Sequence, residues 1–291
     1  MMKKSGLIYI VLASVLWGTS GIFVKYLSPY GVTSLQMTFI RGLVASICMG
    51  IFVLLTDVHT LKTNLKELVL FAGSGFSFFM TASCYYQSMR LTSVSTSVVL
   101  MYTAPIFVMV YSIMFLSEKL SKKKLIAVIG MLIGCCLVSG IIGGLKFELV
   151  GILFGLLSGI AYAAYNIFTK VEMQNGINPV KANFYCFLFS VIVGFIAAKP
   201  FGIIDCIRQN PTVVISLSVG VGFFTCILPY FLYTIALREI PAGTASTLGI
   251  LEPMSATILS VIVLGEKLSL YSLIGITLIL GSVFLISKEK Q

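Results

Sequence analysis

The chain contains little charge and few of the residue types that enzymes use most often as catalysts. Of its 291 residues only 10% are charged, whereas 58% are hydrophobic. So few polar side chains cannot cover a water-facing surface, which excludes a soluble globular protein and indicates that lipid is the main solvent. The single histidine, His59, lies in a predicted loop, which leaves nothing for a histidine-based metal site or a Ser-His-Asp triad.

Cysteine, aspartate and nucleotide-binding motifs offer no catalytic site either. The seven cysteines have no C-x-x-C or metal-ligand spacing, and we interpret them as apolar filler. The two aspartates, Asp57 and Asp205, lie in predicted loops, whereas intramembrane aspartyl proteolysis needs both in the membrane. No G-x-x-x-x-G-K-[ST] loop is present, so direct use of ATP is not expected. We predict a protein that is not an enzyme and that holds no cofactor or metal.

Long hydrophobic runs follow one another along the chain with short interruptions. A bilayer core about 30 Å thick needs roughly 20 apolar residues per helix, and continuous rather than alternating runs favour helices over a barrel. We therefore predict an all-α integral membrane protein with ten transmembrane helices. The predicted spans are 6–27, 33–55, 67–89, 93–116, 124–142, 149–169, 180–198, 212–237, 243–264 and 270–287. The loops leave no room for a soluble domain, so function is expected among the helices.

The formal net charge of +10 comes from loops between hydrophobic segments rather than from one polar face. It therefore does not indicate a nucleic acid partner. If the N-terminus is cytoplasmic, most of the lysine and arginine falls on the cytoplasmic side, as the positive-inside rule requires. We predict a multi-pass protein of a bacterial cytoplasmic (inner) membrane with both termini in the cytoplasm.

The chain repeats itself at a fixed offset. Glu-Lys-Leu-Ser occurs at 118–121 and again at 266–269, an offset of 148. This offset also pairs Tyr85 with Tyr233, Arg90 with Arg238, Thr96 with Thr244 and Pro105 with Pro253. In the first and sixth spans an offset of 145 pairs Gly6 with Gly151, Leu12 with Leu157, Trp17 with Tyr162, Phe23 with Phe168 and Lys25 with Lys170. Because five helices per unit is an odd number, the second unit enters the membrane from the other side. We predict inverted five-helix repeats at 1–142 and 143–291.

Two charged residues, Arg41 and Glu252, lie deep in predicted spans. A charge at a helix centre costs roughly 2.5 to 3.5 kcal/mol on insertion scales, so each needs a partner or a wet cavity. Glu252 is either a cavity carboxylate that binds an amine or a proton, or a hydrogen-bonded structural acid. For Arg41 we favour structural anchoring over contact with a substrate carboxylate. Glu118 and Glu266 close two spans, and we expect them to cap helices or pair with adjacent lysines.

Prolines and aromatic residues mark the candidate transport pathway. Pro105 and Pro253 occupy equivalent positions inside two spans and are predicted hinges, because proline removes a backbone donor; a tolerated kink without solute contact is the alternative. The candidate substrate-binding residues are Trp17, Tyr85, Tyr86, Tyr102, Tyr162, Tyr165, Asn166, Tyr230, Tyr233 and Glu252. For Tyr85, Tyr86 and Tyr233, an aromatic belt at the membrane interface is the alternative.

The sequence resembles the drug/metabolite transporter superfamily, and within it the EamA-like family. The matching pieces are Trp17-Gly18, Phe39-Ile40-Arg41, the 105–120 stretch ending Ser-Glu-Lys-Leu, Leu251-Glu252-Pro253 and the 264–268 stretch Leu-Gly-Glu-Lys-Leu. The resemblance implies ten helices, cytoplasmic termini and a central cavity lined largely by helices 1, 3, 4, 6, 8 and 9. Cys186 stands where the repeat partner has Arg41, so the role of the arginine cannot be symmetric.

We predict a secondary transporter, by resemblance an exporter, that moves a small metabolite such as an amino acid by alternating access. Its partners would be this substrate and the lipid bilayer. A sugar-phosphate or nucleotide-sugar exchanger of the same superfamily is one alternative, but it needs paired basic residues for phosphate, and Arg41 is alone at its depth. A membrane receptor or scaffold without transport is the alternative from another class.

Overall fold

A computed structural model describes residues 4–92, 94–115, 121–138, 148–265 and 269–287. Within these ranges the chain is almost entirely helical and forms no strand. Eight segments are long and apolar enough to cross a membrane, namely Ser5–Tyr30, Leu35–Thr56, Leu65–Leu91, Thr96–Phe115, Leu149–Gln174, Pro179–Ala197, Pro211–Glu239 and Ala242–Val263. A shorter apolar helix, Leu270–Ile286, and the helix Lys122–Val138, which is apolar after its three initial lysines, bring the number to ten. The protein is an all-α membrane protein with ten transmembrane helices in two inverted five-helix repeats.

The first repeat contains two interrupted spans. Its elements are α1 (Lys4–Gly18), α2 (Ser20–Leu27), η1 (Ser28–Tyr30), α3 (Ser34–Thr56), η2 (Val58–Leu61), α4 (Leu65–Leu91), α5 (Val94–Met101), α6 (Ala104–Phe115) and α7 (Lys122–Val138). The helices α1 and α2 form one span, and α5 and α6 another. Polar caps begin the long helices: Thr33 and Gln36 form a reciprocal capping box on α3, and Asn64 accepts from the Glu67 backbone N–H at 2.9 Å.

The second repeat also contains five spans, but its first span is continuous, its third is interrupted, and a short connecting helix is added. Its elements are α8 (Leu149–Gln174), α9 (Pro179–Ala197), α10 (Gly202–Gln209), α11 (Pro211–Gly222), η4 (Phe223–Ile227), α12 (Leu228–Glu239), α13 (Ala242–Leu248), α14 (Leu251–Leu264) and α15 (Leu270–Ser287). A π-helical turn, η4, joins α11 to α12 in one span. Asn178 and Asn210 cap α9 and α11, each followed by proline at the first helical position.

The predicted spans agree with the observed helices to within a few residues where both are described. One correction concerns α8, which continues to Gln174 rather than ending at 169. The polar residues of this last turn do not end the helix, because the Lys170 ammonium donates to the Leu237 and Ile240 carbonyls at 2.7 and 2.8 Å. The helix α10 was not predicted. The boundary at 142/143 stays a prediction, since it lies outside the described residues.

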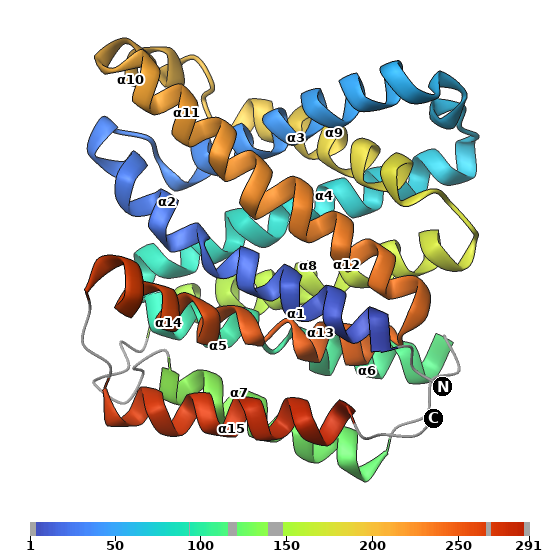
Figure 1. Cartoon of the computed structure of the whole chain (residues 1–291), viewed down its shortest axis with the longest axis vertical. Coiled ribbons are helices and arrows are strands. Elements are labelled where there is room, and N and C mark those ends of the chain that lie inside the picture. Colours follow the sequence, from blue (N-terminus) through green and yellow to red (C-terminus); the bar gives the residue numbers. More distant parts are fainter. Residues whose placement is uncertain (1–3, 93, 116–120, 139–147, 266–268, 288–291) are drawn as a thin grey trace.

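The two repeats run in opposite directions and interlock (Figure 1). The start of α1 and the end of α15 lie on one side of the bundle, which we call the terminal side. The other side, where α2, α4, α7 and α14 end, we call the opposite side. The first helix of each repeat packs on the third span of the other repeat, α1 on α12 and α8 on α4.

Two glycines allow these crossings. A β-carbon on Gly6 would lie 2.9 Å from the Ile240 side chain, and one on Gly151 would lie 2.6 Å from the Thr92 side chain. Gly6 and Gly151 are repeat equivalents at an offset of 145, and Thr92 and Ile240 are equivalents at 148. The inverted repeat of the sequence is therefore repeated in the packing.

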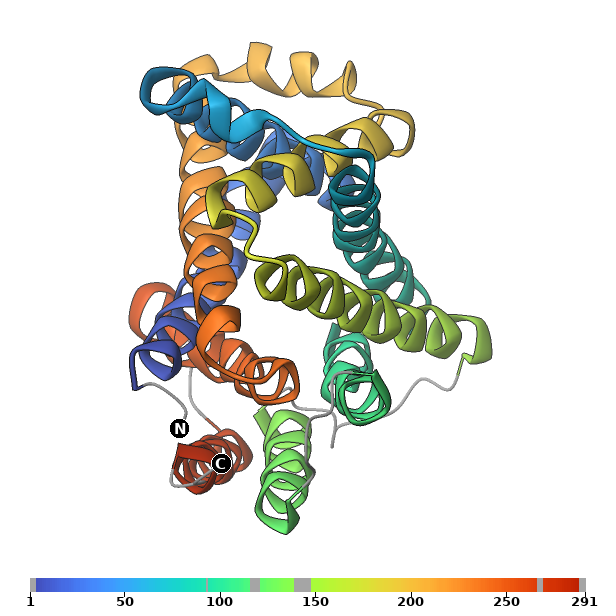
Figure 2. The same ribbon diagram turned by 90° about the vertical axis from the view of Figure 1, so that its right-hand side faces the viewer.

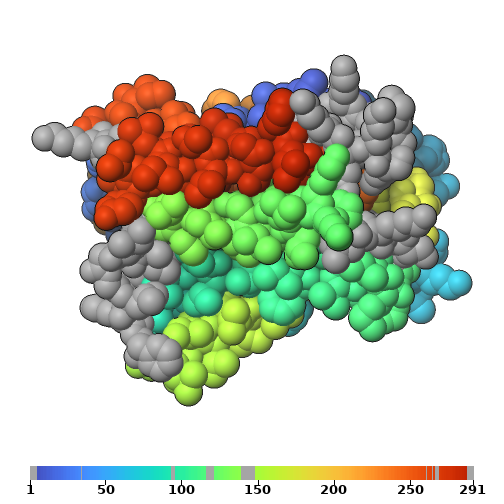
Figure 3. Space-filling view, turned by 90° about the horizontal axis from the view of Figure 1, so that it is seen from below, coloured from blue at the N-terminus to red at the C-terminus, as the bar shows by residue number. Residues whose placement is uncertain are grey.

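The last helices of the two repeats form a layer of their own. Figure 2, which looks from the terminal side, shows α7 and α15 beneath the rest of the bundle, where they pack on α5, α13 and α14. Figure 3 shows the same two helices side by side across the lower face. They cross at Gly134 and Gly275, where a β-carbon on Gly134 would lie 2.8 Å from the Gly275 carbonyl oxygen. Their outer faces, including Ile126 and Leu273, are exposed and suit contact with lipid.

Candidate binding cavity

A cavity of about 510 Å³ lies where the two repeats meet. Helices α1 to α5 and α7 of the first repeat and α8, α12 and α14 of the second contribute to its wall. From Tyr162 and Tyr230 near the middle of their spans, the wall continues to Val24 and Met89 near the ends of α2 and α4. The cavity therefore extends from mid-membrane towards the opposite side of the bundle.

The spans that carry the predicted hinges are interrupted beside the cavity. Between α5 and α6 the Thr103 N–H donates to the Leu100 carbonyl at 3.2 Å, and between α13 and α14 the Ile250 N–H donates to the Thr247 carbonyl at 3.1 Å. These are three-residue turns instead of α-helical ones. Pro105 and Pro253 follow the two breaks at the second and third helical positions. Pro253 lines the cavity and Pro105 does not, and hinge motion at either remains a prediction.

Glu252 brings a carboxylate to the cavity wall. It is the second residue of α14, is half-buried, and lines the cavity. The Tyr102 hydroxyl, at the α5–α6 break of the other repeat, donates to Glu252 Oε2 at 2.7 Å. This hydrogen bond crosses the interface between the repeats and orients the carboxylate at the point where two helices are broken.

Arg41 of α3 brings a guanidinium to the same cavity. Its Cζ lies 5.3 Å from the centroid of the Phe78 ring, a cation–π arrangement. Its Nε is buried without a hydrogen-bond partner. Structural anchoring, as favoured from the sequence, requires several acceptors, but in the described part of the chain no carboxylate or carbonyl oxygen accepts a hydrogen bond from this guanidinium.

Aromatic rings form much of the remaining wall. The Tyr230 ring centroid lies 5.0 Å from those of Trp17 and Phe78 and 5.5 Å from that of Tyr165. These edge-on contacts are favourable ring geometries and hold the rings in place. The Trp17 Nε1 is buried and has no hydrogen-bond partner among the described residues, so this part of the wall contains a neutral donor in addition to Arg41.

The structure brings most of the predicted binding residues to this cavity. Those that line it are Trp17, Tyr85, Tyr86, Tyr102, Tyr162, Tyr165, Tyr230 and Glu252. Asn166 and Tyr233 do not: the Tyr233 hydroxyl donates to Asn166 Oδ1, and the Asn166 amide donates to the Tyr162 carbonyl at 2.6 Å, so both support the wall from behind. Glu118 and Glu266 lie outside the described residues.

Sequence reasoning missed the continuous face of α4. Phe78, Thr81, Ala82 and Met89 line the cavity together with Tyr85 and Tyr86. Their spacing of three and four residues is that of one helical face, and this periodicity was the available signal. Phe78 was overlooked because phenylalanine in a hydrophobic span is indistinguishable from lipid-facing or core residues.

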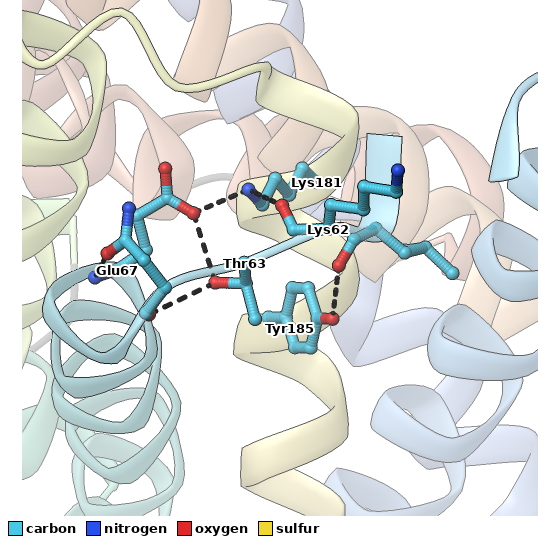
Figure 4. Close-up of polar contacts among 7 residues, drawn as sticks. Lys62, Thr63, Glu67, Lys181 and Tyr185 are labelled. Carbon is cyan, nitrogen blue, oxygen red and sulfur yellow. Dashed lines mark hydrogen bonds and ion pairs between the residues drawn. The ribbon is translucent and has the colours of Figure 1, made fainter. Parts of the chain in front are cut away.

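A polar cluster closes the terminal side of the bundle (Figure 4). Lys181 of α9 forms an ion pair with Glu67 in the first turn of α4 and also donates to the Lys62 carbonyl. The Tyr185 hydroxyl donates to the Leu61 carbonyl at 2.8 Å, and Thr63 donates to Glu67 Oε2 at 3.0 Å. Since α4 and α9 belong to different repeats, these contacts hold the two halves together at the end away from the cavity.

Comparison with known proteins identifies the family. The sequence model of the EamA-like transporter family matches residues 4–140 and again residues 149–288. The chain belongs to the EamA-like transporter family. This EamA-like protein is 28% identical over 280 residues to an uncharacterized transporter of Archaeoglobus fulgidus, with 96% of this chain and 95% of the relative covered. It is 25% identical over 300 residues to the uncharacterized inner membrane transporter YicL of Salmonella typhimurium, covering 99% and 97% of the two chains.

The fold of this EamA-like protein also matches a solved crystal structure. The TM-score is 0.82 at 15% sequence identity, and the match covers 97% of this chain and 96% of the other. At this identity the likeness is one of fold. Family and relatives together establish a multi-pass membrane transporter.

Proposed function

We propose that this EamA-like transporter is a secondary transporter that carries a small zwitterionic metabolite, such as an amino acid, by alternating access. The observation that carries the proposal is that Arg41 and Glu252 line one aromatic cavity, the former without an anionic partner among the described residues. A ligand carboxylate can pair with the guanidinium through two hydrogen bonds. A ligand ammonium can pair with the Glu252 carboxylate, and its apolar part can lie against the rings.

The orientation follows from the charge distribution of the loops. With both termini in the cytoplasm of a bacterial cell, the terminal side is cytoplasmic, and the cavity faces outward in this state. We propose export as the direction, on the resemblance of the family to metabolite exporters. Glu252 would bind the substrate amine or a coupling proton.

The size and charge of the cavity support an amino acid over a sugar phosphate. A volume of about 510 Å³ is in the usual range for small-molecule sites. Among the described residues that line it, Arg41 is the one basic side chain. A phosphate dianion calls for a cluster of basic groups, whereas a single guanidinium with one carboxylate matches a zwitterion.

Exchange measurements on purified protein in liposomes test this function. Labelled amino acids, nucleosides and sugar phosphates are each loaded and exchanged against the same compound. We expect at least one zwitterionic amino acid to exchange, and Glu252→Gln to lower its exchange by at least about tenfold and remove its pH dependence. The control is Glu148→Gln, which changes an exposed carboxylate before α8. Exchange of sugar phosphates alone, or of none of these compounds, contradicts the proposal.

A further inference from the structure

The terminal half of the bundle contains buried polar side chains that do not contact the cavity. Asn166, Thr169, Tyr233, Thr234 and Ser246 are each 2% exposed or less. The Ser246 hydroxyl is without a hydrogen-bond partner in the described part of the chain. Polar groups buried within a membrane are costly, and each needs a hydrogen-bond partner or access to water in some state of the protein. None of the five lines the open cavity, which extends towards the opposite side.

These five residues are the repeat equivalents of residues that line the cavity. The equivalents are Gly21 for Asn166 and Val24 for Thr169 at an offset of 145, and Tyr85 for Tyr233, Tyr86 for Thr234 and Val98 for Ser246 at an offset of 148. All of these equivalents line the open cavity. Because the repeats are inverted, corresponding faces point to opposite sides of the membrane.

We infer that Asn166, Thr169, Tyr233, Thr234 and Ser246 line a second cavity on the terminal side, which is collapsed in this state and opens in the other state of the cycle. This inference rests on the proposed alternating access. The second cavity would contact the same solute through neutral hydrogen-bonding groups. The equivalent of Arg41 is Cys186 and that of Glu252 is Ala104, so the charged groups are not duplicated and form one binding site used in both states.

A pair of equivalent lysines indicates what holds the second cavity closed. Lys170 of α8 donates to the Leu237 and Ile240 carbonyls at the end of α12, at 2.7 and 2.8 Å. A cation at a helix C-terminus is favourable, because these carbonyls lack helical partners. The equivalent of Lys170 is Lys25, which is exposed and has no hydrogen-bond or ion-pair partner in the described part of the chain. At the closed end Lys170 is therefore hydrogen-bonded to a helix terminus, whereas at the open end its equivalent, Lys25, is exposed.

The native cysteine Cys186 can report whether the second cavity opens. Its side chain is 3% exposed, and its equivalent, Arg41, lines the open cavity. Cys84 is buried to a similar degree, 4%, but its equivalent, Leu232, is not assigned to the second cavity. In nanodiscs a hydrophilic maleimide reaches both faces of the protein, and peptide mapping measures the alkylation of each cysteine.

The deciding comparison is between the unmodified protein and Lys170→Gln. We expect the variant to alkylate Cys186 about tenfold faster, the population change expected from losing a charge-assisted hydrogen bond, and Cys84 at an unchanged rate. If the variant folds poorly, the unmodified protein decides: Cys186 should react several-fold faster than Cys84, because each cycle exposes it.

Solute exchange measured in parallel separates the inference from the function. If Cys186 stays as slow as Cys84 in protein that exchanges solute, the second cavity is wrong and the transport proposal stands. If neither alkylation of Cys186 nor exchange is observed, both are wrong. Alkylation of Cys186 without exchange supports the second cavity and contradicts transport.

Discussion

At the scale of single residues, Arg41 combines a positive charge with few hydrogen-bond acceptors in the described part of the chain. Its guanidinium lies over the Phe78 ring with a buried, unpaired Nε. The cation–π contact compensates only part of the cost of removing the charge from water. A bound carboxylate would supply the missing acceptors, so the role in binding that we propose for Arg41 would be obtained at the expense of the stability of the empty protein.

Substitution of Arg41 separates binding from anchoring. Arg41→Lys keeps the charge but loses the two-pronged donor, and we expect ligand affinity to fall about tenfold; Arg41→Met removes both and should lower it about a hundredfold. The thermal unfolding midpoint of the empty Met variant should not fall, because an uncompensated buried charge has been removed. Calorimetric titration and thermal unfolding measure the two effects. A Met variant that binds normally but unfolds at lower temperature would show that Arg41 is an anchor.

At the scale of elements, glycine decides how closely α7 and α15 approach. A β-carbon on Gly134 would lie 2.8 Å from the Gly275 backbone oxygen and 2.7 Å from the Ile279 side chain. The first of these contacts involves backbone, which cannot turn away as a side chain can. Without a hydrophobic effect between helices in lipid, close backbone packing is a main source of their association.

Gly134→Ala tests this helix pair. We expect the substitution to lower the free energy of unfolding by about 1–3 kcal/mol, as overpacking of a filled interface does. The matched control is Gly281→Ala on α15, where an added β-carbon meets nothing within 4 Å, and its stability should be unchanged or slightly raised. Equilibrium unfolding in mixed detergent measures both. Equal stability of the two variants would contradict the close crossing.

At the scale of the whole molecule, the repeats are joined at the terminal side and separated by a cavity towards the opposite side. The Lys181–Glu67 ion pair connects α9 to α4, and its side chains are 9% and 24% exposed. If the two halves rock against each other during transport, this ion pair forms in the state described here and breaks in the other state. Breaking it should therefore change the population of states rather than the fold.

Spin labels on two exposed residues of the terminal side, Lys66 of α4 and Gln174 of α8, can measure that change. We expect Glu67→Gln to raise the fraction of long label–label distances by several-fold, because the variant loses a contact made in the closed arrangement. Asp205→Asn is the control: it removes an ion pair with Arg208 that is exposed and confined to α10, so the distribution should not change. Identical distributions for both variants would show that the ion pair does not control the terminal side.

The sequence alone determined the spans to within a few residues, the inverted repeat, and the tryptophan, tyrosine and glutamate residues of the cavity wall. Hydrocarbon dictates the length and composition of a spanning helix, and duplication leaves a fixed offset, so both can be read from residue order. Tyrosines in otherwise apolar spans, such as Tyr162 and Tyr165, were recognised because a polar group in lipid is costly unless it has a partner or faces a cavity.

Only the tertiary structure decided which polar groups have partners. Glu252 is oriented by Tyr102, 150 residues away, and Lys181 pairs with Glu67 across the two repeats. Among the described residues, Arg41 contacts the face of the Phe78 ring and has no acceptor at Nε. A helix that is hydrophobic all round gives no sign of which face meets protein and which meets lipid. That choice depends on how the two halves pack. The packing places Arg41, which has no carboxylate partner among the described residues, and the oriented Glu252 carboxylate on one cavity.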